Sequence, residues 1–317
     1  MLAGIAKLAA QSPLLEAKQR VEYFDIETRS LVGRCSGTRM PFVWTVNPYR
    51  GCEFGCKYCY ARYAHEFMEL RDPEQFERKI YAKRFDAASF RKELVKVKPS
   101  QSLWIGTATD PYQPAERRYG ITRRILQVIA KERGLKVGIT TKSDLVARDA
   151  ELLQTIAQNS VVHVNMTVTT TDAALARLVE PFAPRPDLRF KAVKELARAG
   201  IPVTILGNPV MPFITDREEN LDAVCAAAKA AGAVCFSAHA LFLKPCSRAV
   251  FLPFVDKHFP RLSAQYRVMY GDRAYLRAAY PEMLAERVKK IRERHGLAPR
   301  DPDFIPDLYA GPQMTLW

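Results

Sequence analysis

Short apolar runs alternate along the chain with longer segments in which apolar residues recur every three or four positions. Runs rich in β-branched residues predict strands, and the 3.6-residue period predicts amphipathic helices. The predicted strands are residues 42–46, 103–107, 136–140, 161–168, 202–206 and 234–238. The helices predicted between them are residues 89–97, 122–133, 144–157, 172–179, 187–199 and 216–231.

Strands separated by helices indicate parallel βαβ units, because a parallel partner is reached only through a crossover connection. We therefore expect an α/β fold, a partial (β/α)6 TIM-type barrel of parallel strands with a C-terminal helical extension. A doubly wound open sheet is the alternative that the same periodicity allows. In both folds, side chains with chemical roles gather at the carboxyl ends of the strands.

Polar clusters follow the predicted strands at those carboxyl ends. They are residues 107–110, 140–144, 167–171, 208–212 and 239–246, and the cysteine-rich segment follows the first strand in the same way. We expect all of them on one rim of the barrel.

The chain divides into four predicted parts. They are an N-terminal lead over residues 1–40, the barrel over 41–249, a C-terminal helical extension packed on the barrel over 250–300, and a tail over 301–317. The lead contains one short predicted helix, residues 13–21, and residues 281–295 are the clearest helix of the extension. Thr215 and Glu218 form a capping-box pattern at the start of the 216–231 helix.

Three of the seven cysteines, Cys52, Cys56 and Cys59, lie within one short segment with the spacing C-x3-C-x2-C. Three thiolates bind three irons of a cubane iron–sulfur cluster and leave the fourth iron open to a ligand that is not protein. The alternative is a structural zinc site with His65 as the fourth ligand. Zinc sites of that kind usually contain two short-spaced cysteine pairs, and no second pair follows here, so the cluster is favoured.

The residues around the cysteines resemble a known family. The C-x3-C-x2-C motif with Tyr58 before its last cysteine is similar to the radical S-adenosylmethionine (SAM) superfamily. The segments NPYRG at 47–51, YAR at 60–62 and TATDPYQP at 107–114 resemble its spore photoproduct lyase-like (DNA repair photolyase-like) branch. The resemblance runs from about residue 40 to about residue 255. It implies the partial-barrel fold and an enzyme whose [4Fe–4S] cluster cleaves SAM to a 5′-deoxyadenosyl radical, with a flavodoxin or ferredoxin as reductant.

The resemblance also implies that Thr109, Lys142 and Thr167 contact SAM. Lys142 stands at a strand end between hydroxyl residues, where a compact positive charge suits the SAM carboxylate. Thr109 can hydrogen-bond the same carboxylate, Thr167 can reach the ribose, and Tyr58 can pack on the adenine. Each threonine also fits ordinary β-branched strand filling.

The sequence departs from the true spore photoproduct lyases at one position of chemical importance. Those enzymes carry a hydrogen-donating cysteine in the segment that matches residues 107–110, and this sequence has none there. The departure argues against thymine-dimer reversal. Cys246, after the last predicted strand, is the catalytic candidate for a thiol that donates hydrogen from another direction, and a small apolar residue at a turn is the alternative.

The charge balance favours a polyanionic partner. Lys and Arg total 48 against 34 Asp and Glu, which gives a net charge of +14 without a block of consecutive basic residues. Such a surplus favours nucleic acid, and the branch resemblance favours DNA. No apolar run is long enough to span a membrane, no signal peptide is evident, and free cysteines fit a reducing cytoplasm. We therefore expect a cytoplasmic protein that does not bind membranes.

The last five residues, Gln313 to Trp317, have the sequence QMTLW. They resemble the pentapeptide with which bacterial repair enzymes and polymerases dock on the DNA sliding clamp. Such a peptide binds through two apolar side chains and a polar head. A tail that packs back on its own domain is the alternative.

Three functions follow from these patterns. The leading hypothesis is a radical SAM enzyme that acts on nucleic acid in a DNA repair or lyase-like reaction. The second keeps the radical chemistry but moves it to a protein, tRNA or small molecule. The third is a non-catalytic iron–sulfur protein that binds nucleic acid or senses redox state, and it leaves Lys142 without a role.

Overall fold

The computed structural model describes residues 4–18, 20–35 and 42–300. Its strands are β1 (Leu14–Lys18), β2 (Val21–Ile26), β3 (Val32–Arg34), β4 (Trp44–Val46), β5 (Tyr49–Arg50), β6 (Lys79–Lys83), β7 (Ser102–Ile105), β8 (Lys136–Thr141), β9 (Val161–Thr167), β10 (Val203–Leu206) and β11 (Cys235–Ser237). Its α-helices are α1 (Gly4–Gln11), α2 (Tyr63–Glu66), α3 (Gln75–Arg78), α4 (Ala87–Leu94), α5 (Pro114–Tyr119), α6 (Ile121–Ile129), α7 (Ala150–Ala157), α8 (Ala173–Val179), α9 (Pro186–Arg198), α10 (Glu218–Ala230), α11 (Pro245–His258), α12 (Ser263–Tyr270) and α13 (Ala279–Arg294). Short 3₁₀ helices are η1 (Tyr60–Arg62), η2 (Asp144–Asp149) and η3 (Pro260–Leu262).

The larger sheet confirms the predicted α/β fold. Among the described residues it has the strand order β11-β10-β9-β8-β7-β4-β3, and its neighbours are parallel except for β3, which pairs antiparallel with β4. The parallel strands β4 and β7 to β11 coincide with the six predicted ones to within a few residues at each end. Within the described part the sheet stays open at β11 and β3, so the barrel is partial.

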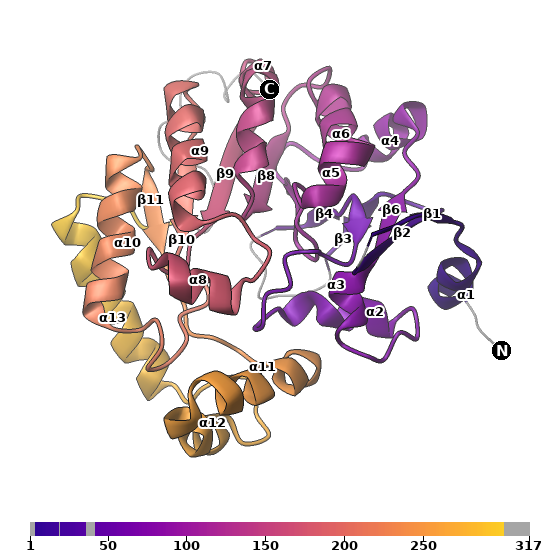
Figure 1. Ribbon diagram of the computed structural model, residues 1–317. Helices are drawn as coiled ribbons and strands as arrows, with labels where there is room; N and C mark the ends of the chain where they lie inside the picture. Colours follow the sequence, from indigo (N-terminus) through magenta and orange to yellow (C-terminus); the bar gives the residue numbers. More distant parts are fainter. Residues whose placement is uncertain (1–3, 19, 36–41, 301–317) are drawn as a thin grey trace.

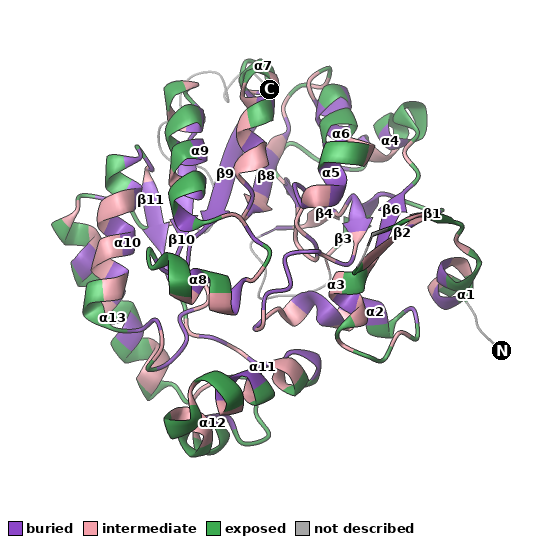
Figure 2. Ribbon diagram, in the orientation of Figure 1, coloured by how far each residue is buried: buried purple, intermediate pink, exposed green. Residues whose placement is uncertain are grey.

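Helices cover the outer face of this sheet, as Figure 1 shows for α6, α7, α9 and α10. Every residue of β9 is buried because side chains pack against both faces of the strand. Figure 2 shows the strands buried and the outward helix faces exposed. Buried apolar side chains from successive strands, such as Ile139, Val164 and Ile205, form the main core.

The N-terminal lead differs from its prediction. Residues 13–21 are not a helix, because residues Leu14–Lys18 form β1 and pair antiparallel with β2. Strand β2 in turn lies parallel to β6, and β6 is antiparallel to β5, which gives a second sheet in the order β1-β2-β6-β5. A strand whose partner is more than fifty residues away leaves no local signal, and the apolar spacing of residues 13–21 imitates a helix.

The predicted capping box at α10 is also wrong. The helix begins at Glu218, and its N-cap is Arg217, which makes no capping hydrogen bond through its side chain. The hydroxyl of Thr215 instead accepts a hydrogen bond of 2.8 Å from the backbone N–H of Met211. Thr215 therefore stabilises the loop before the helix.

Residues after 250 are helical as predicted, although α11 already begins at Pro245. Helix α13 runs beside α10 (Figure 1), and Leu284, Val288 and Ile291 are buried on it. Helices α11 and α12 share a second apolar cluster with the cysteine segment, which brings the extension against that segment. The QMTLW segment lies outside the described residues, so its role at a sliding clamp stays a prediction.

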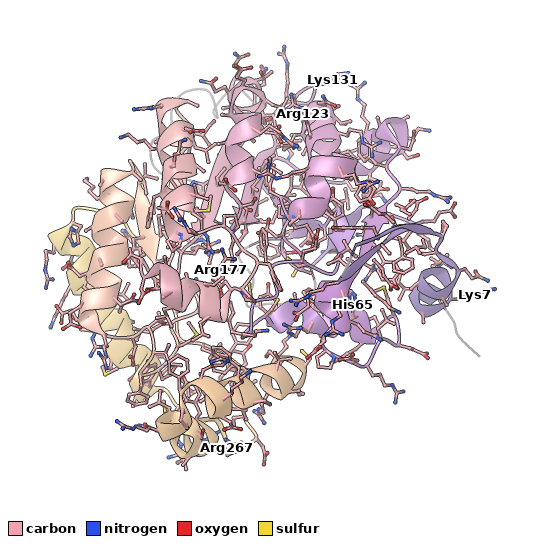
Figure 3. The ribbon with its side chains drawn as sticks, in the orientation of Figure 1. Lys7, His65, Arg123, Lys131, Arg177 and Arg267 are labelled. Carbon is pink, nitrogen blue, oxygen red and sulfur yellow. The ribbon has the colours of Figure 1, made fainter. Side chains whose placement is uncertain are left out.

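None of the described helices combines the length and apolar character needed to cross a bilayer. Figure 3 shows Lys7 on α1, Lys131 after α6 and Arg267 on α12 at well-separated places around the outline. These three cations therefore lie on different helical regions of the surface.

Candidate active site

A cavity of about 370 Å³ lies at the carboxyl ends of the parallel strands. The segments after β4, β7, β10 and β11 and the last residues of β8 and β9 all contribute to its wall. The polar or sulfur-bearing lining residues include Cys52, Cys56, Cys59, Thr107, Thr109, Asp110, Thr141, Lys142, Asn165, Thr167, Asn208 and His239. The structure thus confirms that the polar clusters share one rim.

The cysteine segment follows β5 and begins with a tight turn at Gly51. Its φ is +78°, and a Cβ atom there would lie 2.7 Å from the backbone oxygen of Lys79, so only glycine fits. This close approach lets the backbone N–H of Cys52 donate a 2.9 Å hydrogen bond to the oxygen of Phe76. At the other end, the buried Arg62 donates a 3.0 Å hydrogen bond to the oxygen of Cys56.

Two side chains after β7 hold the same segment. Thr109 donates its hydroxyl hydrogen to the oxygen of Gly51 at 2.5 Å, and Gln113 donates to that oxygen at 3.0 Å and to the Thr109 hydroxyl at 2.9 Å. The Gln113 Oε1 atom accepts from the backbone N–H of Glu53 at 3.0 Å. Thr109, which was predicted to contact SAM, therefore uses its hydroxyl to position the cysteines.

The three thiols line one side of the cavity. Burial raises the pKa of Cys52 well above its ordinary value and raises the pKa of Cys56 to about 12, although the nearby charge of Lys142 opposes the shift at Cys56. Protein groups alone thus favour the protonated thiols of Cys52 and Cys56. A bound metal supplies the positive charge that turns a buried thiol into a thiolate ligand.

Lys142 directly follows the last residue of β8, at the strand end as predicted, and lines the cavity beside the cysteine segment. Its ammonium is 5.6 Å from the centroid of the Tyr58 ring. Burial opposes the charge of Lys142, but the fields of Cys56, Glu180 and Asp110 outweigh it and raise the pKa of the ammonium. Lys142 is a half-buried, persistently positive group in the cavity wall.

Asp110 connects the segment after β7 to the end of β8. It accepts hydrogen bonds from the backbone N–H of Tyr112, from the Thr141 hydroxyl and from the backbone N–H of Lys142, at 2.9, 2.7 and 2.7 Å. These three bonds give Asp110 a structural role at the end of β8 and hold the backbone of Lys142 in place. Burial raises the pKa of the Asp110 carboxyl.

Behind Lys142 lies a buried charge network that no sequence pattern revealed. Arg189 on α9 forms an ion pair of 2.5 Å with Glu180, and both side chains are almost fully buried. The Tyr58 hydroxyl donates to the same carboxylate. Tyr58, predicted to pack on the adenine of SAM, is therefore fixed through its hydroxyl, and its ring faces Lys142.

Strand β9 contributes Asn165 and Thr167, which are two residues apart and point to the same face. The Asn165 Nδ2 atom makes a long hydrogen bond of 3.4 Å to the Thr140 hydroxyl, and its buried Oδ1 atom has no hydrogen-bond partner among the described residues. A buried acceptor at a cavity wall is available to a ligand. Sequence reasoning missed Asn165, and the only signal was an asparagine in the middle of an otherwise apolar run.

His65 does not approach the cysteine thiols as a zinc ligand would. Its Nε2 atom lies 3.0 Å from the backbone oxygen of Lys79, and its ring packs edge-on against Phe76 and Tyr81. His65 belongs to α2, is 1% exposed and is labelled in Figure 3. No three His, Cys, Asp or Glu side chains converge on one metal ion in the described residues, whereas in a cubane each thiolate binds a separate iron.

Cys246 is the second residue of α11 and is buried. Its thiol lies 3.6 Å from the backbone oxygen of Tyr60, and the described lining of the cavity does not include it. Tyr60 does line the cavity, and its phenol donates a 2.6 Å hydrogen bond to the oxygen of Thr107. Cys246 therefore stands behind the cavity wall and not on a loop that faces it.

Comparison with known proteins agrees with this arrangement of thiols at the strand ends. The family model of the radical SAM superfamily matches residues 46–224, more than half of the chain. The chain belongs to the radical SAM superfamily. The resemblance inferred from the C-x3-C-x2-C motif is thereby confirmed for the superfamily.

An uncharacterized protein of Mycobacterium tuberculosis is 35% identical over 262 residues, which cover 82% of this radical SAM chain and 76% of the relative. Among solved structures, spore photoproduct lyase with dinucleoside spore photoproduct matches with a TM-score of 0.64 and 12% identity, over 86% of this chain and 79% of the other. SuiB of Streptococcus suis, bound to the precursor peptide SuiA, matches with a TM-score of 0.51 and 15% identity, over 80% and 47% of the two chains. At these identities the structural matches establish the shared fold.

The radical SAM superfamily uses a [4Fe–4S] cluster and SAM, and the cavity fits both. Cys52, Cys56 and Cys59 supply three soft ligands on one wall. Lys142 supplies a positive charge, and the Asn165 Oδ1 atom is an acceptor still free to bond a hydroxyl. Sulfur ligands, a cation and a free acceptor are the groups that an iron cluster and a polar nucleoside require.

Proposed function

We propose that this chain is an enzyme that reductively cleaves SAM and abstracts hydrogen from a nucleic acid, with DNA the favoured substrate. Cys52, Cys56 and Cys59 would bind three irons of the [4Fe–4S] cluster. The cluster, when bound, supplies the electron that cleaves SAM to methionine and a 5′-deoxyadenosyl radical. Lys142 would pair with the SAM carboxylate, because, of the two cations in the described lining of the cavity, it acts directly on Cys56, whereas Arg300 lies over the Trp104 ring.

The chain's own residues orient the nucleoside part and exclude water. Thr167 and Asn165 line the wall next to Lys142, where their polar atoms can bond ribose hydroxyls. Phe54, Phe76 and Leu241 contribute to a predominantly apolar wall. Such a wall strengthens each polar contact in the cavity, because it lowers the local dielectric. Thr109 and Tyr58 would act indirectly, by positioning the cysteine segment and Lys142.

The observation that favours nucleic acid is a row of aromatic side chains that leads from the surface to the cavity. The row consists of Phe67, Tyr63, Tyr60, Phe242 and Tyr275, and its neighbouring ring centroids are 5.9, 6.5, 5.4 and 5.4 Å apart. Tyr60 and Phe242 line the cavity, and the two end residues are exposed. Aromatic rings at this spacing form a stacking platform for unpaired bases.

A basic group accompanies this aromatic row. The ammonium of Lys244 is 4.4 Å from the centroid of the Tyr63 ring and 6.0 Å from that of Tyr60. Aromatic rings interleaved with cations are typical of single-strand nucleic-acid sites, where the rings stack on bases and the cations neutralise phosphates. The net charge of +14 acts in the same direction.

The known structures offer two substrate classes for comparison. Spore photoproduct lyase holds a dinucleoside photoproduct, and SuiB holds a precursor peptide. The aromatic row and the positive charge support a nucleic acid for this chain. A lyase-like repair reaction needs a hydrogen donor, and Cys246 stays the candidate thiol, although its contact at the cavity wall is with the backbone oxygen of Tyr60.

The test uses anaerobically reconstituted protein with dithionite and SAM, and follows 5′-deoxyadenosine by chromatography. We expect the product from the wild type and none from Cys56→Ala. Repeating the assay with irradiated DNA, undamaged DNA, RNA and peptides identifies the substrate by increased turnover. A cluster without 5′-deoxyadenosine would overturn the proposal in favour of the non-catalytic alternative, and stimulation by peptides alone would assign a protein substrate.

A second variant tests the aromatic row separately from SAM cleavage. The double variant Phe67→Ala/Tyr275→Ala should weaken single-stranded DNA binding by about 30-fold or more, because it removes two rings and each stacked base contributes about 1–3 kcal/mol. Its 5′-deoxyadenosine formation without substrate should match the wild type. Val268→Ala is the matched control, because Val268 is an apolar side chain that is 80% exposed and lies on α12. Equal DNA affinity in all three proteins would exclude the row as the binding surface.

A further inference from the structure

A second cavity, of about 660 Å³, lies at the carboxyl ends of β2 and β6. These strands are parallel neighbours in the smaller sheet, and α4 and the start of α6 complete the wall. The second cavity shares no lining residue with the candidate active site. A crevice beyond the carboxyl ends of parallel strands is a common place for a ligand.

Lys83, the last residue of β6, lies in the wall of the second cavity. The residue is only 9% exposed, and its ammonium has no hydrogen-bond or ion-pair partner among the described residues. Burial, helped by the charge of Arg50, lowers the pKa of Lys83 to about 7, and the opposing field of Glu93 does not prevent the shift. A buried lysine without a partner is costly for a fold, which is why such groups often serve a ligand.

The acidic residues of this cavity are already engaged in the protein. Asp25 and Glu27 form ion pairs with Arg84, and Asp86 caps α4 through the backbone N–H of Ser89. The Oε2 atom of Glu93 accepts hydrogen bonds from the Ser30 hydroxyl and from the backbone N–H groups of Leu31 and Val32. Their charges therefore stabilise local structure, and none forms an ion pair with Lys83.

Further donors are available on the same wall. Arg29 and Arg124 are exposed residues that line the cavity, and the Arg124 guanidinium lies 5.4 Å from the centroid of the Phe85 ring. The buried hydroxyl of Tyr119 has no hydrogen-bond partner among the described residues. An ammonium, two guanidinium groups and a phenol suit an anion with several oxygens, and phosphate accepts such donors well.

We propose that this cavity is a second binding site, for a phosphate-bearing molecule, with Lys83 as the buried anion-binding group. Its size exceeds that of inorganic phosphate and falls in the range of small-molecule sites, and Phe85, Leu31 and Ile121 offer apolar surface to an organic part. The phosphate can belong to a small phosphorylated molecule or to a nucleic-acid backbone. The proposal does not depend on the SAM chemistry.

The test measures binding of inorganic phosphate, a nucleoside monophosphate and a short DNA oligonucleotide to the full chain by titration calorimetry. We expect Lys83→Met to weaken the binding of the phosphate-bearing ligand at least tenfold. Lys79→Met is the matched control, because Lys79 lies on the same strand and its side chain lies outside the second cavity. Lys83→Arg should retain most of the affinity, and Tyr119→Phe should lose two- to fivefold.

Comparing the titrations with the different ligands distinguishes the two sources of the phosphate. If the monophosphate binds and Lys83→Met weakens its binding, the ligand is a small phosphorylated molecule. If the oligonucleotide binds through Lys83 and the monophosphate does not bind, the ligand is a nucleic-acid backbone. A second test needs no variant: lysines of the wild type are acylated at pH 8 with and without the ligand, and the modified residues are identified by mass spectrometry. The bound ligand should protect Lys83 from acylation and should not protect Lys79. Binding by none of the probes at about 10 mM, or equal binding by wild type and Lys83→Met, would overturn the proposal.

Discussion

The hydroxyl of Thr109 donates a 2.5 Å hydrogen bond to the backbone oxygen of Gly51, the residue immediately before Cys52. The segment after β7 therefore stabilises the turn at Gly51, where the cysteine segment begins. Gln113 completes the connection, since it bonds Gly51, Thr109 and Glu53 at once. The geometry of the thiols thus depends on side chains more than fifty residues further along the chain.

Replacing Gln113 should loosen the cysteine segment. Gln113→Leu leaves the buried backbone N–H of Glu53 without its partner, which costs about 1–3 kcal/mol. We expect less iron per chain after reconstitution and faster loss of the cluster absorbance in air. Gln154→Leu is the control, because Gln154 is exposed on α7 and bonds only the backbone oxygen of Ala199. Equal iron content and equal decay for both variants would contradict the prediction.

Removing the charge of Lys142 should weaken SAM binding. A charge-assisted hydrogen bond contributes about 1.5–3 kcal/mol, so Lys142→Met should raise the dissociation constant of SAM roughly 10- to 150-fold. Lys142→Arg keeps the positive charge and should lose less affinity for SAM than Lys142→Met. The measurement is equilibrium binding of SAM to the reconstituted enzyme, with iron content as the control for an intact cluster. Unchanged affinity in Lys142→Met would mean that the SAM carboxylate binds elsewhere.

The buried pair of Glu180 and Arg189 should be far more sensitive than a surface pair. Glu180→Gln or Arg189→Met leaves an uncompensated buried charge and should lower the free energy of unfolding by about 3–5 kcal/mol. The double variant should lose clearly less than the sum of the two single losses. Arg185→Met breaks the exposed pair with Asp187 and should cost at most about 1 kcal/mol. Urea unfolding of the four proteins and the wild type checks this, and additive losses would contradict it.

Two buried histidines should make stability depend on pH. Burial is the main cause that lowers the pKa of His65 to about 4 and of His163 to about 3, while the unfolded value is about 6.5. Below pH 6.5 the unfolded chain therefore binds more protons than the folded chain, so stability is complete above that pH and falls as the pH drops toward 4. Each histidine contributes a slope of at most about 1.4 kcal/mol per pH unit.

The measurement is the free energy of unfolding between pH 7 and pH 4.5, for the wild type and for His163→Gln. The variant should show a slope that is smaller by up to about 1.4 kcal/mol per pH unit, because one of the two histidines no longer takes up a proton on unfolding. Identical slopes for the two proteins would mean that His163 is protonated in the folded state.

Local sequence patterns were sufficient to predict the parallel strands and the rim of polar residues at their carboxyl ends. Each central strand is buried on both faces, so its sequence is a continuous apolar run that stands out without knowledge of its neighbours. The same patterns failed for β1, β2 and β6. Strands β2 and β6 pair with each other across more than fifty residues, and no local pattern in either segment reveals such a distant partner.

The candidate site residues also fall into two groups, those that the sequence indicates and those that only the structure reveals. Cys52, Cys56 and Cys59 are close along the chain, and Lys142 stands at a strand end, so spacing and position alone indicated an iron–sulfur cluster and a cation beside it. The ion pair of Glu180 and Arg189 joins two helical regions, and neither residue carries a local signal.

The chain's periodicity predicted the fold class, and the family that its cysteine motif resembles implied the superfamily and the cofactors, because both signals lie in residues that are near one another in sequence. Only the folded structure decided that Thr109 and Tyr58 hold other groups in place and that Asn165 faces the cavity with a free acceptor. It also decided that Lys83 is buried and has no side-chain partner among the residues that the structure describes. A side chain's role depends on which hydrogen bonds and charges surround it, and those neighbours come together only when distant segments pack.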